Sequence, residues 1–289
     1  DVVLHSSGWQ AVDIDRLEFV SDYKVQGLRN HYHTYGLGVP LIVVRRSHAN
    51  DNSVEQYYPP SVSFPMTAFL RVNRPHAHYF GRDPSISSVE VTSNPRSPTF
   101  VLELHDTLDR QSTVVANRMV PLEADLSPPL APFLNHKQFQ DSKLSTLGIL
   151  RPGNENKPQG LHMFEPYKPE KMPVVMVHGL WSSPITWMEM YNDLRSDPLV
   201  RQHYQFWFYL YPTGQPFWLS ATQMREHLAL MRRHLDPERR SPALDQMVLV
   251  GHSMGGLVSK LETGESEEAF WRTMSERPFS ELNANAEEI

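Results

Sequence analysis

The stretch Met247-Val248-Leu249-Val250-Gly251-His252-Ser253-Met254-Gly255-Gly256-Leu257 contains the strongest structural signal in the chain. It opens with four apolar residues, two of them β-branched, which is typical of a buried strand. A Gly-x-Ser-x-Gly turn follows, and the residues after it are compatible with a helix. Glycines two positions before and after Ser253 are needed where a Cβ would collide with the neighbouring strand and helix. The pattern predicts a strained strand-to-helix turn that lifts the Ser253 hydroxyl clear of a sheet.

The composition is typical of a soluble globular protein, with 289 residues, 40% of them hydrophobic, and a net charge of -6. This length allows one large domain or two of ordinary size, and no apolar run is long enough to span a bilayer. The acidic balance and the lack of a basic, aromatic-rich patch argue against nucleic acid as a partner. The absence of cysteine excludes disulfides, thiolate metal ligands and a cysteine nucleophile. Because the chain opens with Asp1, we expect it to be processed or a fragment.

Residues 1–130 are predicted to form a β-rich N-terminal module. Short β-branched or aromatic stretches alternate there with proline-containing turns, and the best strand candidates are residues 17–20, 39–44, 67–72, 88–91 and 100–104. The histidine pairs in this module, His31 with His33 and His76 with His78, are interpreted as solvated loop residues. We therefore predict no metal site.

A proline-rich segment separates this module from the rest of the chain. Residues 127–132 contain three prolines, which do not continue a helix or a central strand. Residues 131–158 are predicted to be a polar linker, and residues 159–289 to form an incomplete second domain.

The second domain is predicted to have an α/β fold. Apolar runs at residues 173–177, 206–211 and 247–250 are each followed by a helical pattern, with Ser183 and Ser220 as expected N-caps for the first two helices. Strands that alternate with helices give right-handed crossovers and a doubly wound, mostly parallel sheet.

Reactive groups in such sheets gather beyond the carboxyl ends of the strands. There, Ser253 is the predicted nucleophile, and the backbone N–H groups of Leu180 and Met254 are predicted to form an oxyanion hole. The expected supporting residues are His178, Gly179, Gly251, His252 and Gly255. Of two roles for His178, we favour fixing its loop through hydrogen bonds over acting as the base.

Two segments carry a family resemblance. Val175-Met176-Val177-His178-Gly179-Leu180 and Val248-Leu249-Val250-Gly251-His252-Ser253-Met254-Gly255-Gly256 resemble the α/β-hydrolase superfamily. Within it, the chain is most similar to bacterial lipase- and esterase-like serine hydrolases related to the inositol-deacylase branch. The resemblance covers about residues 160–262. It implies an acyl-enzyme mechanism on carboxylic esters of lipids, with no cofactor. It also implies export to the cell envelope and is compatible with peripheral membrane association.

The chain departs from the family's order of nucleophile, acid and histidine, because no histidine follows Ser253. We therefore expect the chain to be cut at its C-terminus, with the base and the acid in missing sequence. The strand that ends at Val250 would keep an unpaired apolar edge. Expressed alone, the chain is expected to be poorly soluble and inactive.

Three functions remain open from the sequence. The leading hypothesis is a serine ester hydrolase, and the second is an acyltransferase on the same scaffold. The third is a non-catalytic binding protein that kept the turn but lost the triad. Four aromatic residues are expected either to line an acyl pocket or to lie in the core: Trp181, Trp187, Phe217 and Trp218.

Overall fold

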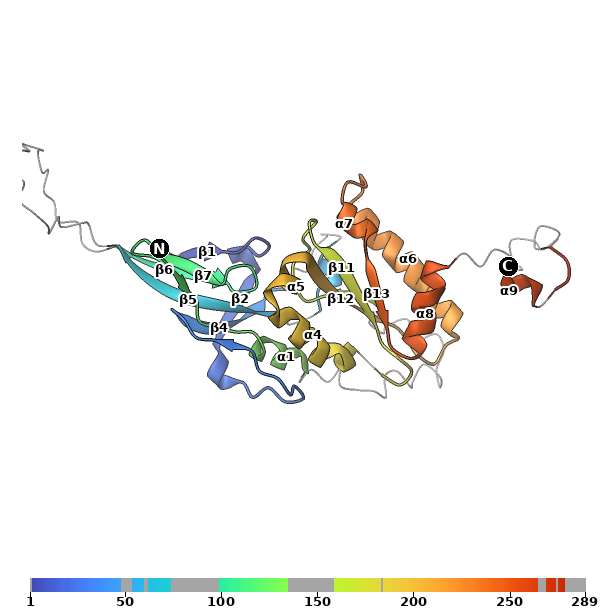
Figure 1. Cartoon of the computed structure of the whole chain (residues 1–289), viewed down its shortest axis with the longest axis horizontal. Coiled ribbons are helices and arrows are strands. Elements are labelled where there is room, and N and C mark those ends of the chain that lie inside the picture. Colours follow the sequence, from blue (N-terminus) through green and yellow to red (C-terminus); the bar gives the residue numbers. More distant parts are fainter. Residues whose placement is uncertain are drawn as a thin grey trace, which may run out of the picture. The chain divides into compact units, whose positions relative to one another are not determined.

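The computed structural model describes residues 2–47, 54–59, 62–73, 99–134, 159–182, 184–264, 269–273 and 275–278 (Figure 1). The chain divides into two compact units that interleave along the sequence. The first comprises residues 1–137, 163–171 and 188–205, and the second comprises residues 138–162, 172–187 and 206–289.

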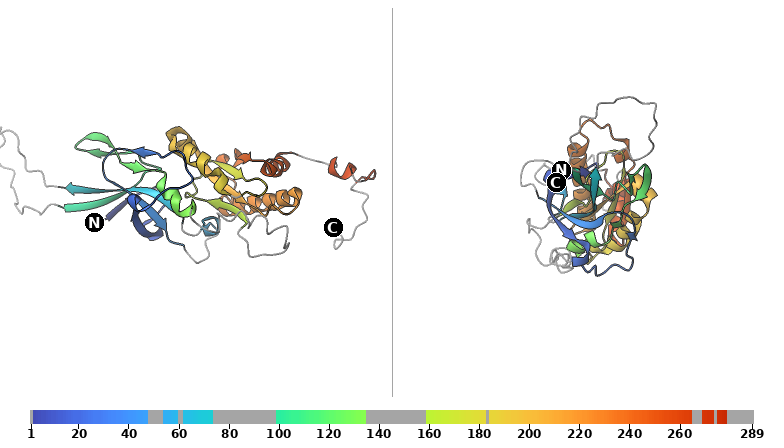
Figure 2. Two further views of the ribbon diagram at one scale, coloured as in Figure 1. Left: turned by 90° about the horizontal axis from the view of Figure 1, so that it is seen from below. Right: turned by 90° about the vertical axis from the view of Figure 1, so that its left-hand side faces the viewer.

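A five-stranded sheet of order β1-β6-β5-β4-β2 forms the first unit. Its strands are β1 (Val2–His5), β2 (Ile14–Phe19), β4 (Val39–Arg45), β5 (Ser63–Asn73) and β6 (Thr99–Asp106). β5 and β6 are long antiparallel neighbours (Figure 2), whereas β1 pairs with β6 in parallel. Because side chains alternate between the faces of a strand, this register decides which distant residues share a face.

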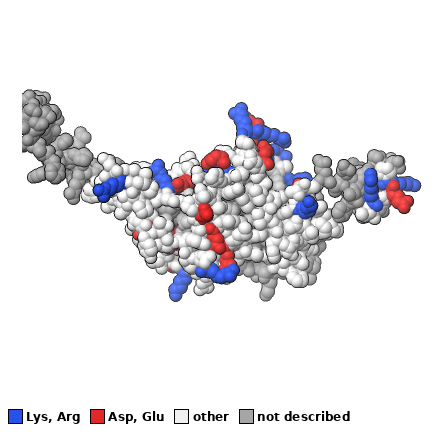
Figure 3. Space-filling view, in the orientation of Figure 1, with Lys and Arg blue, Asp and Glu red and all other residues white. Residues whose placement is uncertain are grey.

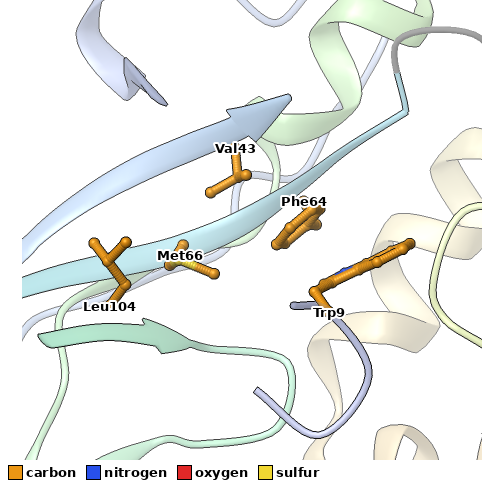
Figure 4. Close-up of a cluster of buried hydrophobic side chains, with 5 residues drawn as sticks. All are labelled: Trp9, Val43, Phe64, Met66 and Leu104. Atoms are coloured by element: carbon orange, nitrogen blue, oxygen red, sulfur yellow. The ribbon is translucent and has the colours of Figure 1, made fainter. Parts of the chain in front are cut away.

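One face of this sheet carries a compact hydrophobic cluster (Figure 4). Phe64 and Met66 alternate along β5, and Val43 and Leu104 point to the same place from β4 and β6. Trp9 closes the cluster, with its ring stacked on Phe64 at 4.9 Å between centroids. The alternation of apolar residues on adjacent strands therefore builds the core of the first unit.

Shorter elements complete the first unit. They are β3 (His33–Thr34) with β9 (Ala124–Asp125), the hairpin of β7 (Ser112–Val115) and β8 (Arg118–Pro121), four 3-10 turns and three helices. The turns are η1 (Ala11–Asp13), η2 (Val20–Asp22), η3 (Glu55–Tyr57) and η4 (Pro128–Leu130). The helices are α1 (Ala131–Leu134), α4 (Met188–Ser196) and α5 (Pro198–His203). Ala116 and Asn117 close the hairpin with φ values of 49° and 60°, as a two-residue primed turn requires.

The second unit is built on a four-stranded sheet of order β10-β12-β11-β13. These strands are β10 (Gly160–Met163), β11 (Met172–Val177), β12 (Tyr204–Leu210) and β13 (Val248–Gly251). β11 and β13 run parallel, with Val177 opposite Gly251 at their carboxyl ends. The two loops that follow these strands therefore leave the sheet at the same edge.

The longest helix of the second unit, α6 (Phe217–Leu235), packs against α8 (Met254–Thr263) (Figure 1). α8 also packs on β11 and β13, and α7 (Pro242–Asp245) packs on β11. The remaining described elements are η5 (Pro184–Trp187) and α9 (Ala269–Arg272). This arrangement of helices on a sheet that contains parallel strands belongs to the α/β class predicted from the sequence.

Strands are present at most of the predicted positions. β2, β4, β5 and β6 include or overlap the predicted N-terminal strands, and the predicted strand at residues 88–91 lies outside the described residues. The sequence analysis missed β1 and the short strands β3, β7, β8 and β9. These five have only two to four residues each, too few for a clear periodic pattern.

The helices differ from the prediction at two places. Residues 128–134 form a 3-10 turn and a short helix, although three prolines were expected to prevent a helix; proline is tolerated at the first helical positions. α6 begins at Phe217 after Pro216, three residues before the predicted cap at Ser220. Ser220 instead accepts a hydrogen bond from the Gln215 side chain at 2.9 Å. The other predicted cap, Ser183, lies outside the described residues.

The division of the chain into domains at residues 130 and 158 stays a prediction. Each compact unit is made of three separate segments of the sequence, so the two units do not follow that division. None of the described helices combines the length and apolar composition needed to cross a membrane. On the face drawn in Figure 3, described basic and acidic side chains are interspersed and uncharged residues cover most of the surface.

Candidate functional site

Ser253 lies at the junction between β13 and α8 in a strained backbone conformation. Its φ and ψ are 54° and -123°, in a sparsely populated region for a residue that carries a Cβ. The residue is exposed, and it is the N-cap of α8. Because the N–H groups of the first helical turn lack partners within the helix, the start of α8 favours negative charge beside this serine.

The glycines around Ser253 allow the turn to be this tight. A Cβ on Gly251 would lie 2.5 Å from the carbonyl oxygen of Gly255. A Cβ on Gly255 would lie 2.8 Å from the carbonyl carbon of Val177 and closer still to its oxygen. Both positions therefore exclude any larger residue unless the backbone shifts.

Backbone hydrogen bonds fix the turn against β11. The N–H of His252 donates to the Val177 carbonyl at 3.0 Å. The N–H of Gly255 donates to the His252 carbonyl at 2.9 Å, and that of Gly256 to the Ser253 carbonyl at 2.8 Å. The position of Ser253 is thus set by the neighbouring strand as well as by its own turn.

The loop after β11 lies directly beside the serine. A Cβ on Gly179 would lie 2.9 Å from Nδ1 of His252 and 3.0 Å from Cβ of Ser253. Trp181 in this loop has a positive φ of 55°, and its N–H donates to Oγ1 of Thr213 at 3.4 Å. The loop is therefore a second strained segment, held next to the first.

One comparison with known proteins found a match that includes this region. Residues 174–263 match the family model described as the alpha/beta hydrolase family. The match runs from β11 through α8 and covers less than a third of the 289-residue chain. No curated protein and no solved structure matches the chain. The matched region supports the predicted superfamily and a hydrolase or related activity.

We call residues 174–263 the hydrolase-like region. The predicted oxyanion donors in it are backbone groups on the two adjoining loops. Leu180 follows Gly179, and Met254 is the first residue of α8. Neither backbone N–H has a hydrogen-bond acceptor among the described residues.

His178 is fully engaged within the hydrolase-like region. It has 0% exposure, and its ring stacks on Tyr211 at 4.5 Å between centroids. Nδ1 lies 3.1 Å from the Gly179 carbonyl, and Nε2 lies 3.4 Å from the Tyr211 N–H. Burial lowers the pKa of His178 to about 4, so the ring is neutral at pH 7. With Nδ1–H donating and Nε2 accepting, neither nitrogen is free to take a proton from Ser253.

The other predicted residues occupy different environments. His252 is exposed beside the turn, with its ring edge-on to Trp187 at 6.4 Å. Trp187 is buried and belongs to the core, whereas Trp181 and Trp218 are 61% and 53% exposed. Phe217 contacts Trp218 with 5.3 Å between ring centroids. Only the exposed aromatic residues are accessible to an acyl chain.

Sequence reasoning missed Tyr211 and Thr213 as anchors of the loop after β11. The Tyr211 hydroxyl donates to the His178 carbonyl at 2.7 Å, which adds to the Thr213 contact with Trp181. Both follow β12, at the edge where loops after parallel strands meet. Their position at a predicted strand end was the available signal, but their partners depend on the strand order.

Proposed function

We propose that this chain carries the nucleophile and oxyanion hole of a serine hydrolase that cleaves carboxylic esters. The observation that carries the proposal is the backbone of Ser253, strained and exposed between β13 and α8. A strained serine at a strand-to-helix turn is the arrangement that presents a nucleophilic hydroxyl in α/β-hydrolases. The family match over residues 174–263 supports the same assignment.

In the proposed reaction, Oγ of Ser253 attacks the ester carbonyl carbon while its proton passes to a base. The carbonyl oxygen becomes an oxyanion that accepts hydrogen bonds from the N–H groups of Leu180 and Met254. Each such donor contributes about 3–4 kcal/mol to stabilising the transition state. The alcohol then leaves with a proton, and water attacks the acyl-enzyme to release the acid and regenerate Ser253.

The proposal does not use His178 as the base. A serine hydroxyl is a weak nucleophile until a base accepts its proton, and His178 has both ring nitrogens engaged. No histidine follows Ser253 in the sequence. The proposal therefore assigns Ser253 as nucleophile and the two N–H groups as oxyanion donors, with a base other than His178 accepting the proton.

An apolar acyl group is the substrate that the surroundings favour. Leu180 and Trp181 on the loop beside Ser253 are 42% and 61% exposed. Burying such side chains against an acyl chain gains roughly 25 cal/mol for each Å² of apolar surface removed from water. We propose a lipid or other long-chain ester, which is compatible with peripheral membrane association.

Labelling with a fluorophosphonate probe tests the nucleophile directly. The protein in its full natural length is expected to form a covalent adduct on Ser253, and Ser253→Ala is expected to abolish it. Ser196→Ala, which changes a partly buried serine elsewhere, should keep the adduct. Absence of labelling in the full-length protein would contradict the enzyme proposal and favour a non-catalytic binding protein.

A second measurement separates hydrolysis from acyl transfer. The unlabelled enzyme would be given an acyl ester with and without an added alcohol or amine acceptor. Release of free acid that the acceptor does not suppress supports the hydrolase. Dominant transfer of the acyl group to the acceptor would identify an acyltransferase on the same scaffold.

A further inference from the structure

A histidine–carboxylate cluster lies in the first unit. β1 pairs with β6 in parallel, with His5 opposite His105. Glu103 lies two residues before His105 on β6, so the two share a face of the sheet. One nitrogen or carboxylate oxygen from each of these three residues lies within 4.8 Å of the others. Two imidazoles and a carboxylate are thus brought together from opposite ends of the first unit's sequence.

His105 has an unpartnered ring nitrogen inside the protein. Its exposure is 0%, and its Nε2 lies 3.0 Å from Oε2 of Glu103. Arg71 donates two hydrogen bonds to the same carboxylate, so Glu103 is held in place beside the His105 ring. In a neutral imidazole one ring nitrogen carries the proton and the other carries a lone pair that can bind a metal ion. Nδ1 has no hydrogen-bond partner among the described residues, although buried polar atoms are rarely left unpaired.

A cavity of about 450 Å³ opens beside the cluster. His5 and Glu103 line it together with Arg71, Arg110, Ser112 and Thr113, the last two on β7. His5 is only partly buried, whereas His105 is fully buried and is not one of the lining residues. The cavity gives the cluster an entry path and room for water on its open side.

We propose that His5, Glu103 and His105 bind a divalent transition-metal ion, for which Zn²⁺ is the best chemical fit. Neutral imidazoles and a carboxylate are the donors of zinc sites with two histidines and one acidic residue. Such sites keep a fourth position open, and here the cavity adjoins the cluster. Calcium and magnesium prefer all-oxygen ligands and fit this donor set less well.

Binding of a metal ion requires a side-chain rearrangement, which the contacts of Arg71 and of the two histidine rings define. Arg71 holds Glu103 through Nε to Oε1 at 2.6 Å and Nη2 to Oε2 at 3.0 Å. A carboxylate has about four acceptor positions, so Glu103 can keep Arg71 and still contact an ion. The two rings are stacked at 4.5 Å with an angle of 10°, so their in-plane lone pairs do not converge. His5, the more exposed ring, turns about its side-chain torsions to complete the site.

Titration of the whole chain with Co²⁺ tests the proposal, with any polyhistidine tag removed. Co²⁺ bound to nitrogen and oxygen ligands at low coordination number gives visible absorption bands, and Zn²⁺ should displace it. We expect one equivalent to bind. His5→Gln, Glu103→Gln and His105→Gln should each weaken binding by roughly tenfold or more.

His203→Gln is the matched control, since it removes an exposed imidazole that is not a member of the cluster. It should bind Co²⁺ as the wild type does. His5→Gln is the decisive variant because His5 is partly exposed and its loss leaves the buried network of Glu103 in place. Far-ultraviolet circular dichroism would verify that each variant folds. Wild type without absorption bands, or His5→Gln with unchanged affinity, would overturn the proposal.

Discussion

Gly255 packs so closely on Val177 that a Cβ at position 255 would lie 2.8 Å from the Val177 carbonyl carbon. The same carbonyl oxygen accepts the N–H of His252 at 3.0 Å. One peptide group of β11 therefore anchors the turn before Ser253 and limits the residue type after it. The nucleophile's position depends on the contact between two strands and a helix.

Gly255→Ala should therefore destabilise the second unit. Overpacking a closely packed contact costs about 1–3 kcal/mol, and here the neighbours are backbone atoms that cannot move aside. Gly256→Ala is the control, since a Cβ there would find its nearest neighbour at 3.6 Å. In the helix interior that change should stabilise by about 0.5–1 kcal/mol. Urea unfolding measures both, and equal effects would contradict the proposed packing constraint.

Ser253→Gly should make the protein more stable than Ser253→Ala. A residue with a Cβ at the φ of 54° and ψ of -123° found for Ser253 is strained, by about 1–3 kcal/mol. Glycine relieves this strain, and its greater chain entropy offsets about 0.5–1 kcal/mol of the gain. Comparing the two variants by urea unfolding removes the effect of the lost hydroxyl. If the alanine variant were the more stable, the turn would not be strained.

Arg45 should contribute far more to stability than Arg29, although both make two-pronged ion pairs. Arg45 is 8% exposed, bonds Glu55 at 2.7 and 2.6 Å, and lies 4.4 Å over the Tyr58 ring. Breaking a buried pair costs about 3–5 kcal/mol, so Arg45→Ala should lose a comparable amount.

Arg29 provides the matched comparison, because its pair with Glu189 at 2.8 Å is solvent-exposed. Arg29→Ala should change the unfolding midpoint much less than Arg45→Ala, since water and salt screen exposed pairs. If the two variants lost similar amounts of stability, burial would not decide the strength of the two ion pairs.

Asp106 should make the stability fall as the pH rises towards neutral. Burial, with the nearby charge of Asp109, raises the pKa of Asp106 from 3.8 to about 7. The folded state holds this proton more tightly than the unfolded chain does. The contribution of protonated Asp106 to the free energy of unfolding is therefore fully present below the unfolded pKa. It is lost as the pH rises through the folded pKa.

Asp106→Asn removes this ionisation and should flatten the pH dependence. We compare the free energy of unfolding of the variant minus that of the wild type at two pH values. This difference should be higher at about pH 8 than at about pH 4 by roughly 1 kcal/mol or more. Denaturant titrations at both pH values would measure it. A difference between the two proteins that is independent of pH would show that Asp106 does not titrate in this range.

The signals that sequence analysis found were local. The run from Met247 to Leu257 predicted a strand, a tight turn and a helix, because apolar periodicity and glycine spacing depend on neighbouring residues only. The apolar run ending at His178 predicted β11 in the same way. One helix boundary was wrong: α6 begins at Phe217 rather than after Ser220, and Pro216 is its N-cap.

Contacts between distant segments were not predictable from the sequence. Nothing near His5 in the sequence indicates His105 or Glu103, which become its neighbours only through the parallel register of β1 and β6. The grouping of α4 with the first compact unit likewise depends on bonds such as Asn192 Nδ2 to the Asn30 carbonyl at 2.9 Å. Such pairings require the strand order and register of the folded chain.

For the hydrolase-like region, the sequence by itself determined that Ser253 lies in a glycine-flanked turn between a strand and a helix. Tertiary structure decided what surrounds it: the Val177 carbonyl that anchors the turn, and the Gly179 loop beside it. It also decided that His178 is buried with both nitrogens engaged. The physical reason is range, because backbone strain follows from adjacent residues, whereas burial and hydrogen-bond partners follow from strands brought together only on folding.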